Sequence, residues 1–346
     1  MDWVKWLYPG MKLKRWLFLF SIGVIVSALG LAMLFNYQVI SVLEEAIFRL
    51  LFQLTGSYSA TTLVLAGVVI LAVGLLSMVY AMRRLVQSMV QALIPDSQEK
   101  LVERLFAMRK RDKGPAVVVV GGGTGLSVLL RGMKYLTANC TAVVTTADDG
   151  GSSGRLREEL GIIPPGDLRN CLVALADTEP LMEKLMQYRF GGTSSLGGHS
   201  LGNLFIAAMA QVAGDMEKGL QATSKVLKVR GQVLPSTLAP VQLKATLDDG
   251  SLIVGESTIP GAGKKIVRVE LLPSDPPAVA SSVAAIEKAD LLVFGPGSLY
   301  TSIIPNLLVP GIREAILASK AIRIYICNVM TQPGETDGYT AADHLQ

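Results

Sequence analysis

The segment Val117–Leu130, "VVVVGGGTGLSVLL", joins a run of β-branched residues to a glycine-rich bend and then to a second apolar run. Glycines at the start of a helix let a phosphate approach the backbone N–H groups, so this bend predicts a phosphate or nucleotide site. Its spacing departs from the dinucleotide fingerprint, because Leu126 takes the place of the last glycine, and no P-loop lysine follows. A tight strand–helix turn without a ligand is the alternative. The residues expected to hold phosphate are Gly122, Gly123, Thr124 and Gly125.

A second glycine-rich segment, "TTADDGGSSGRLREE", follows the next predicted strand at Thr145–Glu159. Asp148 and Asp149 are adjacent, so at the end of a strand they point in different directions. One of them can ligate Mg²⁺ or a ribose while the other is structural, and an Asx-type turn is the alternative for the pair. Further ligand contacts are expected from Ser152, Ser153 and Arg155.

Two later segments, "GGHSLGNLF" and "FGPGSLYTSIIPNLLVPG", carry polar and small residues where a helix opens and where a strand ends. Turns at the carboxyl ends of strands lie at the ligand edge of an open α/β sheet. The residues expected to line the pocket are His199, Asn203, Gly295, Gly297 and Ser298. No catalytic residue is assigned, because the chain has two histidines and the aspartates are adjacent rather than facing, so we expect binding without turnover.

The elements that must position these residues alternate between strand and helix patterns from Pro115 onward. This alternation predicts an α/β fold with a Rossmann-like, doubly wound and mostly parallel sheet. A hairpin is expected to turn at 248–250. The other strands are expected at 116–120, 141–146, 265–272, 290–294 and 322–329. The helices are expected at 126–136, 180–188, 201–212, 278–288 and 312–318.

The N-terminal region contains two stretches without charge, 16–35 and 61–82, each long enough to cross a membrane. We expect residues 1–84 to form a transmembrane hairpin, with buried helices of a large soluble core as the alternative. The loop between the stretches has a single basic residue, Arg49, and the positive-inside rule therefore places both ends in the cytoplasm. The flanking basic residues are Lys5, Lys12, Lys14, Arg15, Arg83 and Arg84.

Residues 85–114 are expected to form an amphipathic helix, from Asp96 to Arg109, and a basic linker. The net charge of +4 is mild and indicates no nucleic-acid partner. The three cysteines, Cys140, Cys171 and Cys327, lack CxxC spacing, which excludes a zinc knuckle and a disulfide framework. We expect them to be small buried hydrophobes of a cytoplasmic domain.

Six motifs in order resemble the gluconeogenesis factor (YvcK-like) family, within the 2-phospho-L-lactate transferase (CofD) superfamily. They are "GGGTGLS", "ADDGGSSGRLR", "PPGDLRN", "HSLGNL", "FGPGSLYTSIIPNLLVPGI" and "TQPGETDGYT". The resemblance covers residues 115–346. It implies that Gly122 to Gly125 hold phosphate, that Asp148 and Asp149 lie at the pocket, and that Asn203 and Gly295 to Ser298 line it.

The resemblance implies a regulator that binds UDP-sugars such as UDP-N-acetylglucosamine and that is needed for cell shape and envelope synthesis during gluconeogenic growth. Cell-envelope synthesis proteins are the implied partners, and a homo-oligomer is left open. A nucleotide- and Mg²⁺-dependent transferase resembling the deazaflavin enzyme is the alternative, and a dinucleotide-dependent oxidoreductase is the weakest. The typical family member is soluble, whereas we expect a two-pass membrane protein here. The family's domain continues further, so we also expect a truncated C-terminus.

Overall fold

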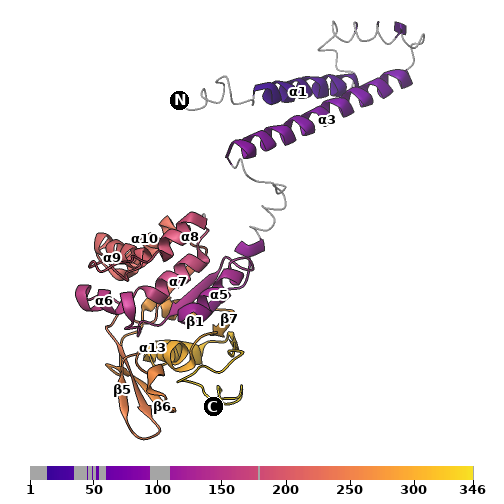
Figure 1. Cartoon of the computed structure of the whole chain (residues 1–346). Coiled ribbons are helices and arrows are strands. Elements are labelled where there is room, and N and C mark those ends of the chain that lie inside the picture. Colours follow the sequence, from indigo (N-terminus) through magenta and orange to yellow (C-terminus); the bar gives the residue numbers. More distant parts are fainter. Residues whose placement is uncertain are drawn as a thin grey trace. The chain divides into compact units, whose positions relative to one another are not determined.

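The computed structural model describes residues 14–34, 45, 49, 52–53, 60–93, 110–177 and 180–345. It divides into two compact units, Met1–Phe106 and Ala107–Gln346, which are described separately below (Figure 1). The helix expected at Asp96–Arg109 and the basic residues Lys5 and Lys12 lie outside the described residues.

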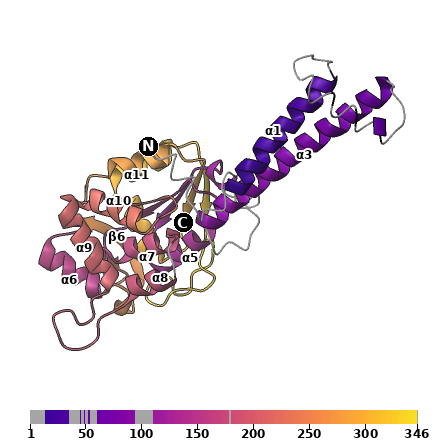
Figure 2. The ribbon, with the colours of Figure 1, turned by 90° about the horizontal axis from the view of Figure 1, so that it is seen from above.

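The N-terminal unit contains two long helices, α1 (Lys14–Leu34) and α3 (Ala60–Leu93), which lie side by side (Figures 1 and 2). Their contact is formed by small residues: a Cβ on Gly74 would lie within van der Waals distance of Ser27, 2.7 Å from its backbone nitrogen. Large apolar side chains point outward instead, and Leu76 is 69% exposed. Small residues inside and large apolar residues outside are typical of helices that pack in lipid. The buried small residues are Gly23, Ser27, Gly30, Gly67, Gly74 and Ala81.

Among the described helices, one is long and apolar enough to cross a membrane by length and composition, at Val64–Ser88 within α3. It overlaps the second predicted span. The described apolar part of α1, Phe18–Leu31, is shorter. One membrane-crossing helix is therefore consistent with the structure, whereas the two-pass hairpin stays a prediction.

The second unit is built on a five-stranded sheet in which every pair of neighbours is parallel. The strand order is β3-β2-β1-β7-β8, and it reverses direction between β1 and β7. In such sheets the carboxyl ends of the strands at the reversal form the ligand crevice. The parallel α/β expectation is thus confirmed. The strands are β1 (Val117–Gly121), β2 (Cys140–Val144), β3 (Gln232–Pro235), β7 (Leu291–Phe294) and β8 (Ile322–Tyr325).

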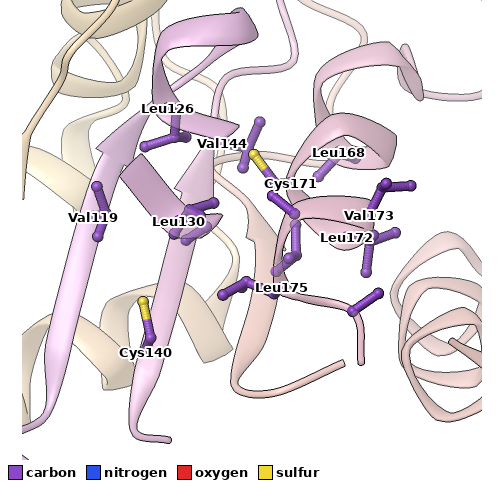
Figure 3. Packing of buried hydrophobic residues seen from close by; sticks show 14 of the residues in the cluster. Val119, Leu126, Leu130, Cys140, Val144, Leu168, Cys171, Leu172, Val173 and Leu175 are labelled. Carbon is purple, nitrogen blue, oxygen red and sulfur yellow. The ribbon is translucent and has the colours of Figure 1, made fainter. Parts of the chain in front are cut away.

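Helices cover one face of this sheet with an apolar core, part of which is shown in Figure 3. Val119 of β1 faces this core together with Leu126 and Leu130. Cys140 and Cys171 are buried in it, as expected, whereas Cys327 is only half-buried, and burial raises the pKa of the Cys140 thiol to about 12. The helices on this face are α5 (Gly123–Met133), α7 (Gly166–Leu175), α9 (Leu201–Ala213) and α10 (Met216–Val226).

The opposite face of the sheet packs against a second apolar core, which Val118 and Val120 enter. Because β1 is buried on both faces, its sequence is an unbroken valine run rather than an alternating pattern. The second core is covered by α11 (Ala280–Glu287), α12 (Ile304–Leu307), α13 (Pro310–Ala318) and an antiparallel sheet of β4 (Gln242–Leu247), β5 (Leu252–Val254) and β6 (Ile266–Leu272). The hairpin predicted at 248–250 joins β4 to β5 and is confirmed.

Several elements differ from the sequence prediction. A helix, α6 (Gly151–Leu160), begins inside the segment expected to be a polar loop. Its first four residues, "GSSG", have low helix propensity, so the sequence did not predict a helix there. β2 ends at Val144 and does not include Thr145 and Thr146, and β8 ends at Tyr325 rather than Val329. β3, α7, α10 and α12 were not predicted. The predicted helix at 180–188 is confirmed as α8 (Pro180–Gln187).

Candidate functional site

Three helices, α6, α7 and α9, begin around a cavity of about 250 Å³ beyond the carboxyl end of β2. Four of the predicted site residues line it: Asp148, Ser152, Ser153 and Asn203. The cavity therefore brings together the second and third sequence segments singled out above. Its other lining residues are Gly150, Gly151, Gly166, Asp167, Arg169, Asn170 and Arg189.

Backbone and hydroxyl contacts connect the starts of α6 and α7. The N–H of Gly150 donates to the Asp148 carboxylate at 2.9 Å, and the N–H of Gly166 donates to Ser153 Oγ at 3.1 Å. The residue before α6, Gly150, has no side chain and therefore cannot cap the N–H groups of the first turn. An uncapped helix start next to a cavity favours a negatively charged ligand.

The two adjacent aspartates point in different directions, as the alternation predicts. Asp148 lines the cavity, whereas the Asp149 carboxylate accepts the backbone N–H groups of Glu256 at 3.1 Å and Ser257 at 2.9 Å. Asp149 thus attaches the segment after β5 to the start of α6. Of the two, Asp148 is the one placed to contact a ligand or a metal ion.

A buried polar network supports the cavity wall. Ser152 Oγ lies 3.1 Å from His199 Nδ1 and accepts a hydrogen bond from Asn203 Nδ2 at 3.0 Å. Arg169 donates to Asn203 Oδ1 at 3.0 Å and also to Ser200, the residue that caps α9. His199 is 3% exposed, and partial desolvation, with the nearby Arg155 charge, lowers its pKa. His199 therefore positions Ser152 and is neutral near pH 7.

The glycine bend after β1 does not line this cavity. A Cβ on Gly122 would lie 2.6 Å from Asp167 Oδ2, and the backbone N–H of Gly123 lowers the pKa of the same carboxylate. A Cβ on Gly125 would lie 2.7 Å from the carbonyl oxygen of Pro296. In the structure these glycines allow close packing of protein segments, and their role toward phosphate, with that of Thr124, stays a prediction.

The loop after β7 is held by residues from the C-terminal segment. Asn328 donates to the carbonyl oxygen of Gly297 at 2.9 Å, and Gln332 donates to Ser298 Oγ at 2.6 Å. Gly295 has a φ of +78°, which favours glycine. These residues lie at the carboxyl end of β7, next to the glycine bend, but do not line the cavity at α6.

The predicted contact Arg155 also lies outside the cavity lining. Its guanidinium donates to the carbonyl oxygen of Gly197 at 2.8 Å, and Arg189 donates to that of Gly198 at 2.7 Å. Both arginines therefore hold the loop 191–198, which lies between α8 and α9, against the site.

Carboxylates gather beside the cavity and raise one another's pKa. Burial, together with the Asp148 charge, raises the pKa of Asp167 to about 6. Burial and the charges of Asp148 and Asp167 raise the pKa of Glu256 to about 8. The Arg169 charge offsets this effect only in part, so a cation would relieve the remaining repulsion, and carboxylate oxygens are the ligands that Mg²⁺ prefers.

Asp148 and Asp167 fit one or two protein ligands of a Mg²⁺ ion that keeps several waters and ligand phosphates. Among the described residues, no group of three or more His, Cys, Asp or Glu side chains forms an all-protein metal cage. The donor set therefore fits a cation that arrives with a phosphorylated ligand.

Five residues near the cavity were not singled out from the sequence: Asp167, Arg169, Asn170, Arg189 and Glu256. The first three lie in "PPGDLRN", a motif that was recognised as part of the family pattern without roles for its residues. Arg189 and Glu256 lie outside the motifs quoted above, so no signal in the single sequence identified them.

Comparisons with known proteins place the chain in a family. Residues 117–346 match the family model described as 2-phospho-L-lactate transferase CofD. The gluconeogenesis factor of Halalkalibacterium halodurans is 61% identical over 230 residues, covering 66% of this chain and 71% of its own. That of Bacillus subtilis (strain 168) is 56% identical over 232 residues, covering 67% and 73%.

A relative from Nostoc sp. (strain PCC 7120) is 53% identical over 349 residues, which cover 100% of this chain and 75% of its own. A crystal structure of a Bacillus halodurans protein superposes with a TM-score of 0.66 at 60% identity, covering 67% of this chain and 75% of that one. The family match spans most of the α/β unit, and the identities far exceed those of fold likeness alone. The chain belongs to the gluconeogenesis factor family, within the superfamily of 2-phospho-L-lactate transferase CofD.

Proposed function

We propose that this protein is a membrane-tethered regulator that binds a UDP-sugar such as UDP-N-acetylglucosamine and acts in cell shape and envelope synthesis, particularly during gluconeogenic growth. The observation that carries the proposal is the cavity at the starts of α6, α7 and α9. It combines an uncapped helix start, buried hydroxyl and amide groups, and the guanidinium groups of Arg169 and Arg189. Such a site suits a diphosphate attached to polar groups.

The contacts around the cavity favour holding a ligand over reacting it. Ser152 and His199 are within hydrogen-bond distance, yet among the described contacts no carboxylate orients the His199 imidazole, as the third member of a triad would. Arg155 and Arg189 connect the site to the loop 191–198. Ligand binding would order this loop for a protein partner, and envelope synthesis proteins are the proposed partners.

Long incubation of the purified protein with UDP-N-acetylglucosamine and Mg²⁺ tests this proposal. We expect reversible binding by calorimetry and unchanged ligand by chromatography, because no described group is placed as an activated nucleophile. Release of UDP that disappears in Asp148→Asn would replace the regulator with an enzyme. Glu314→Gln, an exposed change on α13, is the matched control.

A transferase is the second candidate, and the carboxylates favour it. Asp148 and Asp167 would hold Mg²⁺, which when bound would neutralise phosphate charge during transfer. Ser152, held by His199 and Asn203, would orient the ligand. Incubation with guanine nucleotides and Mg²⁺ in place of the UDP-sugar, followed by product analysis, distinguishes the two candidates.

The membrane tether is supported by the packing within the N-terminal unit. Near one end of the α1–α3 pair, the Trp16 and Tyr80 rings lie 5.8 Å apart, and the Arg84 guanidinium lies 5.6 Å from the centre of the Trp16 ring. Aromatic and basic side chains together are typical of the membrane–water interface. We infer that this end faces the cytoplasm, with the α/β unit in the same compartment.

Cysteine labelling in intact cells tests the two-pass topology. We expect an impermeant thiol reagent to label Glu45→Cys, because the segment between the helices would lie outside, and to leave Lys113→Cys unlabelled until the cells are lysed. Both positions are exposed in the structure. Labelling of Lys113→Cys in intact cells would show that the inferred orientation is wrong.

A further inference from the structure

The usual phosphate position of a Rossmann-like fold is the start of the first helix after the first strand. In this protein that position carries the protein's own negative charge. The Asp167 carboxylate occupies the space beside Gly122 together with a methyl group of Thr145, and the backbone N–H of Gly123 lowers the pKa of this carboxylate. A carboxylate at a helix start already satisfies the positive end of the helix dipole, and it repels a phosphate.

At the next helix, α6, the Asp148 carboxylate accepts the N–H of Gly150, the residue before the helix, and not an N–H of the first turn. Gly150 offers no side-chain cap, and the first turn consists of Gly151, Ser152 and Ser153, all of which line the cavity. No Cβ blocks access at Gly151, where a side chain would have nothing within 4 Å. Because all three residues line the cavity, a ligand there would meet this helix start.

Arg169 supplies a second, independent indication of a ligand. It lines the cavity and is 9% exposed, and its Nε atom is buried without a hydrogen-bond partner. Its other contacts are to the neutral groups of Ser200, Asn203 and Asn170. Burial lowers the pKa of its guanidinium more than the nearby Asp167 and Asp148 charges raise it, so an added anion would favour its charged form.

Arg189 adds a second positive charge at the same cavity. Burial lowers the pKa of Arg169, and the Arg189 charge lowers it further, so an anion between the two would relieve both effects. Neither arginine forms a salt bridge within the part of the chain that the structure describes. Asp148 and Asp167 on the same cavity supply the oxygens for a cation that would accompany a diphosphate.

We propose that the diphosphate of the nucleotide sugar binds at the start of α6, beside Arg169 and Arg189, rather than at the glycine bend that begins α5. This inference rests on the proposed function, since it places one group of the ligand proposed there. The glycine bend then lets Asp167 lie close to the backbone at the start of α5. The phosphate binds at the second strand–helix turn of this protein, instead of the first turn that Rossmann-like folds usually use.

Binding of UDP-N-acetylglucosamine, UDP and inorganic pyrophosphate to the full-length protein in detergent tests the site. We expect Arg189→Gln to weaken all three by about tenfold or more, the loss typical of one charge-assisted hydrogen bond, and Arg189→Lys to retain part of the affinity. Arg189 is exposed, so its replacement should change the melting temperature little, and Arg189→Lys, which retains a donor for the carbonyl oxygen of Gly198, controls for the loop contact. The matched control is Arg230→Gln, which lies before β3 at the opposite edge of the sheet and pairs with Asp177.

Hydrogen exchange of the same protein locates the diphosphate directly. We expect UDP-N-acetylglucosamine to slow exchange of the amides at 151–153 and to leave those at 123–125 unchanged. Protection confined to 123–125, with full affinity in Arg189→Gln, would overturn the inference while the proposed function stands. If pyrophosphate binds in an Arg189-dependent manner and the UDP-sugar does not bind, the proposed function fails while the anion site stands. Absence of binding by all three probes would overturn both.

Discussion

Replacing Gly154 with alanine should abolish ligand binding and lower the melting temperature of the α/β unit by about 10 °C. A Cβ at this position would lie 2.0 Å from the backbone carbonyl oxygen of Asp149, and backbone cannot move aside as a flexible side chain can. Separating the two would displace the first turn of α6 from the cavity. The expected destabilisation is about 3 kcal/mol, typical of forced overpacking in a close contact.

Gly132→Ala is the matched control for this change. Gly132 is exposed within α5, and a Cβ there would meet nothing within 4 Å. Alanine at an exposed helix position stabilises by about 0.5–1 kcal/mol relative to glycine, so this variant should melt at or above the wild-type temperature and bind normally. Thermal unfolding and calorimetry on both variants decide the matter, and a Gly154→Ala protein with wild-type melting and affinity would contradict the close approach seen here.

The second large effect is a loss of stability as the pH rises. Burial and the charges of Asp148 and Asp167 raise the pKa of Glu256 to about 8, from a usual value of 4.5. The folded state therefore retains a proton that the unfolded chain has already released, and the free energy of unfolding falls between pH 4.5 and about 8. One fully retained proton gives about 1.4 kcal/mol per pH unit, and partial solvation of Glu256 makes the slope smaller.

Glu256→Gln isolates this contribution because glutamine has the same shape and does not ionise. In a buffer free of divalent cations, we expect the variant to melt at a higher temperature than the wild type at pH 8 and to show a flatter pH dependence from 5 to 8. In Glu256→Gln, stability should still fall with a smaller slope up to about pH 6, because the pKa of Asp167 is raised to about 6. Glu314→Gln should reproduce the wild-type curve, and an unchanged slope in Glu256→Gln would assign the pH dependence to other groups.

The tertiary structure changes how the glycine-rich motifs should be understood. Both were predicted to be ligand loops because glycine permits close approach of a phosphate. In the structure, Gly122, Gly125 and Gly154 are instead required because protein atoms lie within 3 Å of their missing Cβ positions. A glycine pattern in one sequence reports that something lies close to the backbone, and only the folded chain identifies whether it is protein or ligand.

Sequence alone was sufficient for the features that depend on neighbouring residues. Alternating strands and helices predicted the parallel α/β sheet, and Asp248 to Gly250 predicted the hairpin turn. Charge-free length identified the part of α3 that is long and apolar enough to cross a membrane. Each of these signals is local, because backbone periodicity, turn chemistry and hydrophobic length are properties of a single segment.

Only the tertiary structure decided which residues share the cavity and which charges meet there. Glu256 and Asp149 are joined although they lie 107 positions apart, and Asp167 reaches the helix start at Gly123 from the beginning of another helix. Arg169 and Arg189 acquire their shared environment from the packing of α7 beside the starts of α6 and α9. Contacts between distant segments depend on how the whole core packs, and burial then sets the pKa values, so neither could be derived from residue spacing.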